Sequence, residues 1–372
     1  MRRIYLDNAA TSYPKPKCVV DSYYSYAVSN GSSSNRSENP YTFEADEKIF
    51  DLREKLKEIL NLKDGFVSFT FNATTAINYV LYSFLNANDH VLISCLEHNS
   101  VVRSLNELKV DYDLLSSDEK GQIIVKDIKY QIKPNTKALV IQSANNVFAT
   151  VQDIEKIKNE IKDLGIELIV DASQSLPYLD INMEGISALI AAGHKGLMAM
   201  MGTAIIAVNN SFVKKINKCL IAGATGSKSN DLNMMKTFPE YFEAGTQNVP
   251  ALISFYDSLE YIYSDIKSYR EKILKLSNYL DEKLRSLDDF IVFNFDKRIP
   301  VYSIAHKTQD NADVSNYLTK CGFQHRLGLH CTSLSHKYFS TNGTIRFSFS
   351  IFNSFEELDL LIDALKNYNS SN

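Results

Sequence analysis

One lysine stands in a setting that favours covalent chemistry on its amine. Lys195 lies in a Gly-His-Lys-Gly run at residues 193–196, directly after the apolar, strand-like residues 187–191. The end of a buried strand is where α/β proteins place ligands, and partial loss of water there favours the neutral amine that imine formation requires. An isolated lysine is more often a solvated surface residue, so the prediction depends on its neighbours.

Two further polar residues follow predicted strands upstream. Asp171 ends the apolar run 168–171, and His98 follows the run 91–95. A carboxylate at such a point can keep a pyridine nitrogen protonated, which makes the ring an electron sink, and an imidazole can stack on the face of that ring. Taken alone, Asp171 is equally a helix N-cap, and His98 is equally a capping or core histidine.

Hydroxyl-bearing turns supply two candidate phosphate sites. Thr74 and Thr75 lie between a strand and a helix, where backbone N–H groups and the helix dipole suit a dianion. A second turn, residues 223–227, contains Thr225 between two glycines. Threonines also cap helices without any ligand, so these turns gain weight from the order along the chain: phosphate turn, histidine, aspartate, lysine.

The intervening segments predict one sheet that positions these residues. Helical patterns at residues 41–60, 74–85 and 153–164 alternate with strand-like runs at 66–70, 91–95, 138–142, 168–171 and 203–208. Such alternation favours a mostly parallel α/β sheet with helices on both faces. From about residue 249, a long helical stretch followed by short strands and helices predicts a smaller α+β domain. We therefore expect a large domain of residues 16–248 and a smaller one of residues 1–15 and 249–372.

Composition excludes several other classes. The chain has 372 residues, 45% of them hydrophobic, which is enough for a large core. Its 40 basic residues are scattered and balanced by 44 acidic ones, which argues against a nucleic-acid surface. No apolar run is long enough to span a membrane, and the N-terminus lacks an apolar signal core, so a cytoplasmic protein is expected. The five cysteines form no CxxC pair and predict neither a metal site nor a disulfide framework.

In combination, these motifs resemble fold-type I pyridoxal-phosphate (PLP) enzymes, and within them the class V aminotransferase and cysteine desulfurase family. The resemblance runs nearly end to end. The matching segments are residues 5–12, 97–100, 171–174, 193–196, 242–248, 326–331 and 344–348. It implies the fold of a PLP-dependent transferase, with a mixed, mostly parallel sheet in the large domain, PLP as cofactor and a homodimer as the assembly.

The resemblance also implies a role for each matching residue. Lys195 would hold PLP as a Schiff base, His98 would stack on its ring and Asp171 would pair with the pyridinium. Gln174 would contact the ring oxygen, and the phosphate would be bound by Thr74, Thr75 and His194. Thr225 would contact the phosphate bound by the partner subunit. The substrate would be contacted by Asn8, Ala9, Asn146 and Arg346.

Cys331 selects among the reactions of the family. In the cysteine desulfurases that this chain resembles, the cysteine at this position attacks the substrate sulfur and becomes a persulfide. Free cysteines are often inert core residues, but this one has polar neighbours, and His330 with Arg326 could stabilise its thiolate. The predicted function is PLP-dependent desulfuration of L-cysteine to alanine, with the sulfur passed to an acceptor protein. Selenocysteine lyase action and another class V reaction are the alternatives.

Four positions depart from the family pattern. Ala192 lacks a hydroxyl where Ser or Thr usually touches the phosphate, which would weaken cofactor binding by roughly 0.5–1.5 kcal/mol. Ala149 replaces a glycine, a residue that often marks positive φ. Asn39 stands near a usual histidine, and residues 197–202 replace a stretch that is usually richer in glycine.

Overall fold

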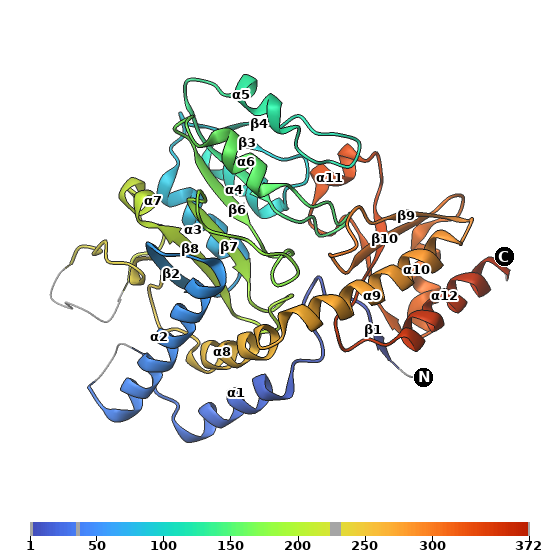
Figure 1. Ribbon diagram of the computed structural model, residues 1–372, viewed down its shortest axis with the longest axis horizontal. Coiled ribbons are helices and arrows are strands. Elements are labelled where there is room, and N and C mark those ends of the chain that lie inside the picture. The colour runs from blue at the N-terminus through green and yellow to red at the C-terminus, as the bar shows by residue number, and fades with distance from the viewer. Residues whose placement is uncertain (1–2, 35–37, 224–231, 371–372) are drawn as a thin grey trace.

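A seven-stranded sheet forms the centre of the computed structural model, which describes residues 3–34, 38–223 and 232–370 (Figure 1). Across the sheet the strand order is β2 (Gly65–Thr70), β8 (Ala204–Asn209), β7 (Ala188–Ala192), β6 (Glu167–Asp171), β5 (Thr136–Gln142), β3 (His90–Ile93) and β4 (Asp111–Leu114). The strands β7, β6, β5, β3 and β4 run parallel to one another, whereas β8 runs antiparallel to both β7 and β2. The predicted mixed, mostly parallel sheet is therefore confirmed.

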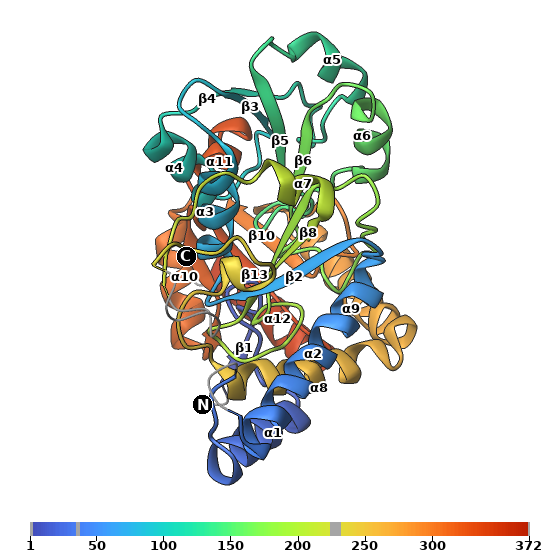
Figure 2. The same cartoon turned by 90° about the vertical axis from the view of Figure 1, so that its left-hand side faces the viewer.

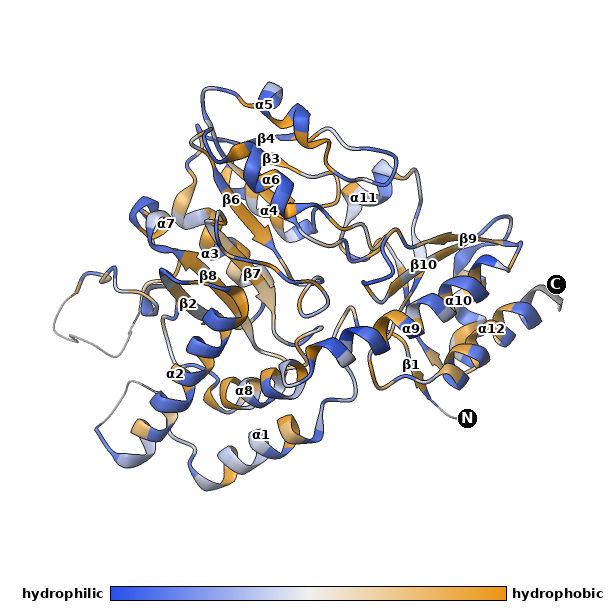
Figure 3. Cartoon of the chain, viewed as in Figure 1, coloured by the Kyte–Doolittle hydropathy of each residue, from blue (hydrophilic) through white to orange (hydrophobic). Residues whose placement is uncertain are grey.

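Helices cover both faces of this sheet because successive strand side chains point to opposite sides. On β5, Leu139 and Ile141 join a core with α2 (Pro40–Leu60), α6 (Ile154–Ile161) and α8 (Val249–Tyr263). Ala138 and Val140 face α3 (Ala73–Phe84), α4 (Asn99–Leu108) and α7 (Asn210–Lys215). The strands colour as apolar between these helices in Figure 3. The helices α2, α8 and α1 (Lys17–Ser29), which packs on α8, lie together on one side in Figure 2.

A second, smaller sheet is antiparallel and has its own core. Its order is β12 (Arg326–Gly328), β13 (Thr344–Ser348), β10 (Val301–His306) and β9 (Phe290–Phe293). The helices that share its core are α9 (Ile266–Arg285), α10 (Asn311–Lys320) and α12 (Phe355–Ser370). The short helix α11 (Ser333–Tyr338) instead packs Leu334 against the core on the α3 side of the central sheet. Beside it, β1 (Ile4–Tyr5) pairs in parallel with β11 (Phe323–Gln324), so the start of the chain packs with its last third. Two short helical turns, η1 (Val125–Asp127) with α5 (Ile128–Gln131) and η2 (Glu240–Phe242), complete the described elements.

The long helical stretch predicted after residue 249 is two helices. It breaks at Ser264, and the side chain of Asp265 accepts a hydrogen bond from Ser268 N as the N-cap of α9. The apolar face of α8 packs on the central sheet, whereas Leu276, Leu280 and Leu284 of α9 belong to the smaller core. The domain division at residue 249 stays a prediction. In the described part of the chain, no helix combines the length and apolarity needed to cross a membrane.

A buried ion pair ties α2 to the segment that follows η2. Arg53 donates from Nη1 and Nη2 to the two carboxylate oxygens of Glu243, each at 2.7 Å. Glu243 also accepts from Phe69 N at 2.6 Å, and the side chains of Arg53 and Glu243 are only 13% and 5% exposed. Removing one partner of such a pair leaves the other charge buried and uncompensated.

We therefore expect Arg53→Met to lower the free energy of unfolding by about 3–5 kcal/mol. Lys57→Met is the matched control, because Lys57 lies one turn further along α2 and pairs with Glu54 at the surface. It should cost less than about 1 kcal/mol. Chemical denaturation of both variants measures the difference, and equal losses would contradict the role assigned to the buried pair.

Candidate active site

A cavity of about 200 Å³ lies where the carboxyl ends of the parallel strands meet the smaller sheet and the N-terminal segment. It brings together most of the residues singled out in the sequence. Its lining includes Ala9, Thr74, His98, Asn146, Asp171, His194, Lys195, Cys331 and Arg346. Asn8, Thr75 and Gln174 are not among the lining residues, and Thr225 lies outside the described residues.

The turn that carries Lys195 is shaped by close packing. A Cβ on Gly193 would come within 2.5 Å of the Thr203 hydroxyl, and one on Gly196 within 2.3 Å of the Leu176 carbonyl oxygen. The two glycines are therefore needed for close approach of the backbone. Burial lowers the pKa of Lys195 to about 8, although the Asp171 carboxylate opposes this and raises it. A larger fraction of this amine than of an ordinary lysine is thus neutral and nucleophilic near neutral pH.

Asp171 and His98 both face the cavity from strand ends. Asp171 ends β6, is buried and accepts a hydrogen bond from Ser173 N at 2.9 Å. His98 caps α4, with Nδ1 accepting from Ser100 N at 3.1 Å. Burial first, and then the charge of Lys195, lower the pKa of His98 to about 4. The ring is therefore neutral, and because Nδ1 is an acceptor, its proton lies on Nε2. His98 is a capping residue and a cavity residue at once.

Arg346 is buried against the N-terminal segment. Its Nη2 donates to Asp7 Oδ1 at 2.7 Å and its Nη1 to the carbonyl oxygen of Asn146 at 3.1 Å. Its Nε is buried without a partner in the described part of the chain. Burial lowers the pKa of Arg346, and Asp7 opposes the shift. The free N–H groups suit a planar carboxylate. The sequence analysis did not assign a role to Asp7, which directly precedes Asn8 and Ala9 in the opening motif.

The Cys331 segment is held in an unusual backbone conformation. His330 and Cys331 have φ of 49° and 59°, a left-handed conformation that costs roughly 1–2 kcal/mol per non-glycine residue. Two hydrogen bonds hold the segment, from Asn146 Nδ2 to His330 O at 2.8 Å and from Asn99 N to Cys331 O at 2.7 Å. The Cys331 residue is exposed. A rigid backbone thus presents the thiol at the mouth of the cavity.

The expectation that His330 helps to stabilise the thiolate is not supported. Its Nε2 lies 2.9 Å from the carbonyl oxygen of Thr344, and burial lowers its pKa to about 2. A neutral imidazole bonded away from the thiol supplies no positive charge. Arg326 lines the same cavity as Cys331 and has no side-chain hydrogen bond or ion pair among the described residues, so its guanidinium is an unengaged positive charge in the cavity.

The predicted residues outside the lining support the wall of the cavity. Asn8 donates to Ser348 O and accepts from Tyr13 N, each at 3.1 Å. Gln174 Nε2 donates to Ala9 O at 2.9 Å, and the hydroxyl and N–H of Thr75 bond the N-cap Asn72.

All four departures from the family pattern can now be placed. Ala149 has a φ of 54°, so alanine does adopt the left-handed conformation here, and Met198 does so within the 197–202 stretch with a φ of 56°. Asn39 is the N-cap of α2 and accepts from Tyr41 N and Thr42 N. Ala192 lines the cavity without a hydroxyl, but Ser173 lies beside it and accepts from Ala192 N at 3.2 Å.

The lining also offers partners that a phosphorylated pyridine aldehyde would use. At one end lie the N-terminus of α3 with Thr74, and His194, whose Nδ1 is buried without a partner among the described residues. Elsewhere lie the Asp171 carboxylate, the flat His98 ring and the Lys195 amine. One cavity therefore holds a helix N-terminus that suits a phosphate, a carboxylate that can pair with a protonated ring nitrogen, and a nucleophilic amine that can bind an aldehyde. These groups fit a phosphorylated pyridine aldehyde.

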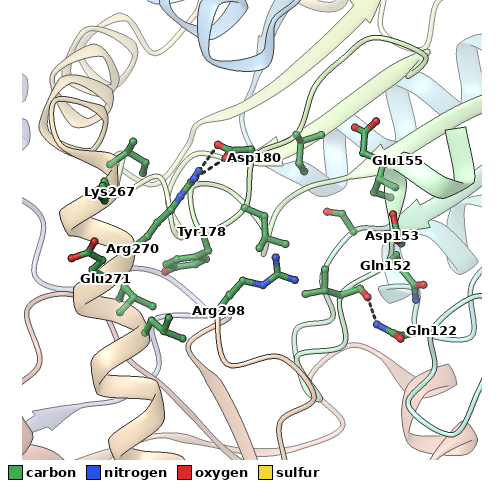
Figure 4. A pocket seen from close by; sticks show the side chains of 18 residues that line it. Gln122, Gln152, Asp153, Glu155, Tyr178, Asp180, Lys267, Arg270, Glu271 and Arg298 are labelled. Atoms are coloured by element: carbon green, nitrogen blue, oxygen red, sulfur yellow. Dashed lines mark hydrogen bonds and ion pairs between the residues drawn. The ribbon is translucent and has the colours of Figure 1, made fainter. Parts of the chain in front are cut away.

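A second, larger cavity of about 770 Å³ lies between α9 and the large sheet's loops (Figure 4). Both of its arginines are already engaged. Arg270 forms two hydrogen bonds to Asp180, at 2.9 and 2.7 Å, and Arg298 is paired with Asp296 at 2.6 Å. None of the residues assigned to chemistry lines it, so we place the candidate active site in the smaller cavity.

Fold and site together define an α/β enzyme built around a reactive lysine. Residues 4–361 match the family model described as aminotransferase class-V. The chain is 30% identical to a probable cysteine desulfurase of Borreliella burgdorferi, over 98% of this chain and 91% of that protein. A probable cysteine desulfurase of Methanothermobacter thermautotrophicus is 28% identical, over 98% of this chain and 94% of the relative.

Solved structures share the fold. A cysteine desulfurase from Thermococcus onnurineus superposes with a TM-score of 0.90 at 24% identity, covering 100% of this chain and 95% of that one. One from Escherichia coli has a TM-score of 0.88 at 20% identity, with 99% and 95% covered. The chain belongs to the aminotransferase class-V family, and its fold is that of the cysteine desulfurase structures.

We predict that Asp171→Asn lowers the pKa of Lys195 below about 8, because the carboxylate raises it in the folded protein. The cofactor-free variant should therefore react faster with an acylating reagent at pH 7, as followed by mass mapping of the Lys195 peptide. Asp180→Asn, at a surface carboxylate paired with Arg270, is the control. A slower or unchanged rate in folded Asp171→Asn would contradict this electrostatic assignment.

Proposed function

We propose that this protein is a PLP-dependent cysteine desulfurase that converts L-cysteine to alanine and carries the released sulfur as a persulfide on Cys331. The observation that carries the proposal is the presence, in one cavity, of a lysine with a lowered pKa, a buried carboxylate and an exposed thiol. The named relatives over almost the whole chain support the same activity.

Most of the residues that we assign to the cofactor line the cavity, and Thr75 and Gln174 support its wall. Lys195 would bind the aldehyde carbon, Asp171 the ring nitrogen and His98 the ring face, while Gln174 would contact the ring oxygen. Thr74, Thr75 and His194 would receive the phosphate together with the N-terminus of α3. When bound, PLP supplies an electron sink that acidifies the substrate Cα–H and accepts electron density from it.

The chain's own groups orient the substrate and move its protons. Arg346 offers Nε–H and its remaining N–H groups to the substrate carboxylate, next to Asn146 and the Asn8–Ala9 backbone. Arg326 adds positive charge at the mouth of the cavity. Once displaced by the substrate amine, the Lys195 amine can accept the Cα proton, because its pKa of about 8 lies near neutral pH.

Sulfur transfer follows from the position of Cys331. Its thiolate attacks the substrate sulfur, an S–S bond forms, and the Cβ–S bond breaks with its electron pair remaining on the carbon side. That carbon is then protonated to give alanine, so the substrate carbon is reduced and the sulfur of Cys331 is oxidised to the persulfide. An acceptor thiolate on another protein would then attack the outer sulfur and release Cys331 as a thiolate.

The proposal includes a cytoplasmic homodimer. Helices α1 and α2 expose several large apolar side chains: Val20, Tyr24, Val28, Tyr41, Phe43 and Phe50. Such a patch is typical of an interface. In the dimer, Thr225 would contact the phosphate bound by the partner subunit. Five free cysteines are compatible with a reducing compartment.

The cofactor assignment is tested by Lys195→Ala. The wild-type protein mixed with PLP should develop the visible absorbance of a protonated imine, and borohydride should fix PLP to Lys195. The variant should show neither signal, since no other amine is a lining residue of the cavity. Wild-type protein without the absorbance band would contradict the cofactor assignment.

The persulfide assignment is tested by Cys331→Ser. This variant should retain the imine absorbance but lose more than 99% of sulfide and alanine formation from L-cysteine, roughly the effect of losing a catalytic nucleophile. Cys18→Ser, at another exposed free cysteine, should behave as wild type. Equal turnover in Cys331→Ser would exclude the thiol as the sulfur acceptor.

A further inference from the structure

Four donor groups converge on a single carbonyl oxygen beside Lys195. The oxygen of His194 lies 2.9 Å from Ser12 N, 3.0 Å from the Ser12 hydroxyl, 3.2 Å from the Thr11 hydroxyl and 3.1 Å from Lys15 Nζ. Lys15 Nζ also donates to the Ser12 hydroxyl at 2.7 Å. A carbonyl oxygen has two lone pairs, so this is an unusually dense set of donors.

The consequence follows from the planarity of the peptide group. The oxygen of His194 lies in one rigid plane with the nitrogen and Cα of Lys195. Fixing the oxygen therefore fixes the point from which the Lys195 side chain extends into the cavity. Thr11, Ser12 and Lys15 are not lining residues of that cavity, so they can act on Lys195 only through this peptide.

Burying the amine of Lys15 costs free energy that a purely structural contact would not require. No carboxylate pairs with it in the described part of the chain, and burial lowers its pKa to about 7. Holding a desolvated amine against a carbonyl and a hydroxyl gains less than an apolar side chain would at a site of pure packing. Costly polar groups of this kind tend to mark functional sites.

The same segment also holds the substrate side of the cavity. Asp7 pairs with Arg346, and Ala9 donates from its N–H to the Ser348 hydroxyl at 2.8 Å. One stretch, residues 7–15, is therefore the common frame for the reactive lysine and for the arginine opposite it.

We propose that Lys15, relayed by Ser12, is a positioning residue for Lys195 and acts through the carbonyl oxygen of His194. This inference rests on the proposed function, in which Lys195 is the reactive amine. It assigns no contact between Lys15 and substrate or cofactor. Its role is to set the reactivity of an amine that it does not touch.

The test compares Lys15→Met with Lys17→Met. Lys17 lies two residues further on, and its side chain is 87% exposed in a surface pair with Asp21. We expect PLP to become attached to Lys195 about 10-fold more slowly in Lys15→Met, the rate equivalent of one charge-assisted hydrogen bond, and within about 2-fold of wild type in Lys17→Met. Attachment is followed by borohydride trapping and mass mapping of the Lys195 peptide.

A second measurement needs no cofactor. The acylation rate of Lys195 in the cofactor-free protein is measured together with the melting temperature. This rate should fall in Lys15→Met. It should recover to within about 3-fold of wild type in Lys15→Arg, which keeps the charge and the donors. Unchanged Lys195 reactivity would overturn the proposal. So would a loss that only follows the unfolded fraction, because that indicates an anchor of stability alone.

The milder variant Ser12→Ala keeps the assay informative if Lys15→Met does not fold. It removes the hydroxyl relay and retains the Ser12 N–H, so we expect a change of about 3-fold in the same direction. Wild-type behaviour of Ser12→Ala would then overturn the proposal. If wild-type protein attaches no PLP to Lys195, the proposed function fails, while the acylation measurement still decides the role of Lys15.

Discussion

The buried guanidinium of Arg346 is the interaction on which the rest of the site depends. A charge removed from water needs partners inside the protein, and here they come from the start of the chain and from its middle: Asp7, and the carbonyl oxygen of Asn146. Asp7 can reach it only because the N-terminal segment returns to β13, bonded to Ser348 along the way. On the adjacent strand, Arg326 lies directly opposite Arg346. Such a like-charge pair is unfavourable, and it is tolerated because one member is ion-paired and the other exposed.

Burial then tunes the ionisable groups around this charge in a single direction. It favours neutral forms: the pKa of His98 falls to about 4 and that of Lys195 to about 8, while the pKa of Glu97, behind the cavity, rises to about 8. Glu97 accepts from Ser94 and from Gln142 N, so it spans the ends of β3 and β5 as a largely protonated acid. Near neutral pH, His98 is therefore neutral and Glu97 mostly protonated, whereas Lys195 is neutral only in part.

Two of the residues with a left-handed backbone, His330 and Cys331, line the same cavity. The left-handed conformations of Ala149, Met198, His330 and Cys331 persist because neighbouring hydrogen bonds hold them. Asn146 contacts both groups: its side chain donates to His330 O in the Cys331 segment, and its carbonyl oxygen accepts from Arg346. One short loop after β5 thereby orients both the Cys331 segment and the Arg346 guanidinium.

The sequence by itself determined the mostly parallel sheet, the order along the chain of the candidate residues that follow its strands, and the lysine predicted to be reactive. Apolar periodicity reports local geometry, and parallel strands bring their carboxyl ends to one edge. It therefore placed Asp171, His98 and Lys195 together without knowledge of any contact. The replacement of a glycine by Ala149 could also be seen in the sequence. Only the backbone angle showed that alanine adopts the left-handed conformation there.

Tertiary structure alone decided which partners these groups have. Asp7 and Arg346 are 339 residues apart, and Lys15 lies 179 residues from the carbonyl that it bonds, distances over which no periodic pattern carries information. The direction of the His330 ring, away from the thiol, was equally invisible, because adjacency in sequence does not fix where a side chain points. Desolvation and long-range hydrogen bonds arise only when remote segments pack, and they set the ionisation and orientation on which the chemistry depends.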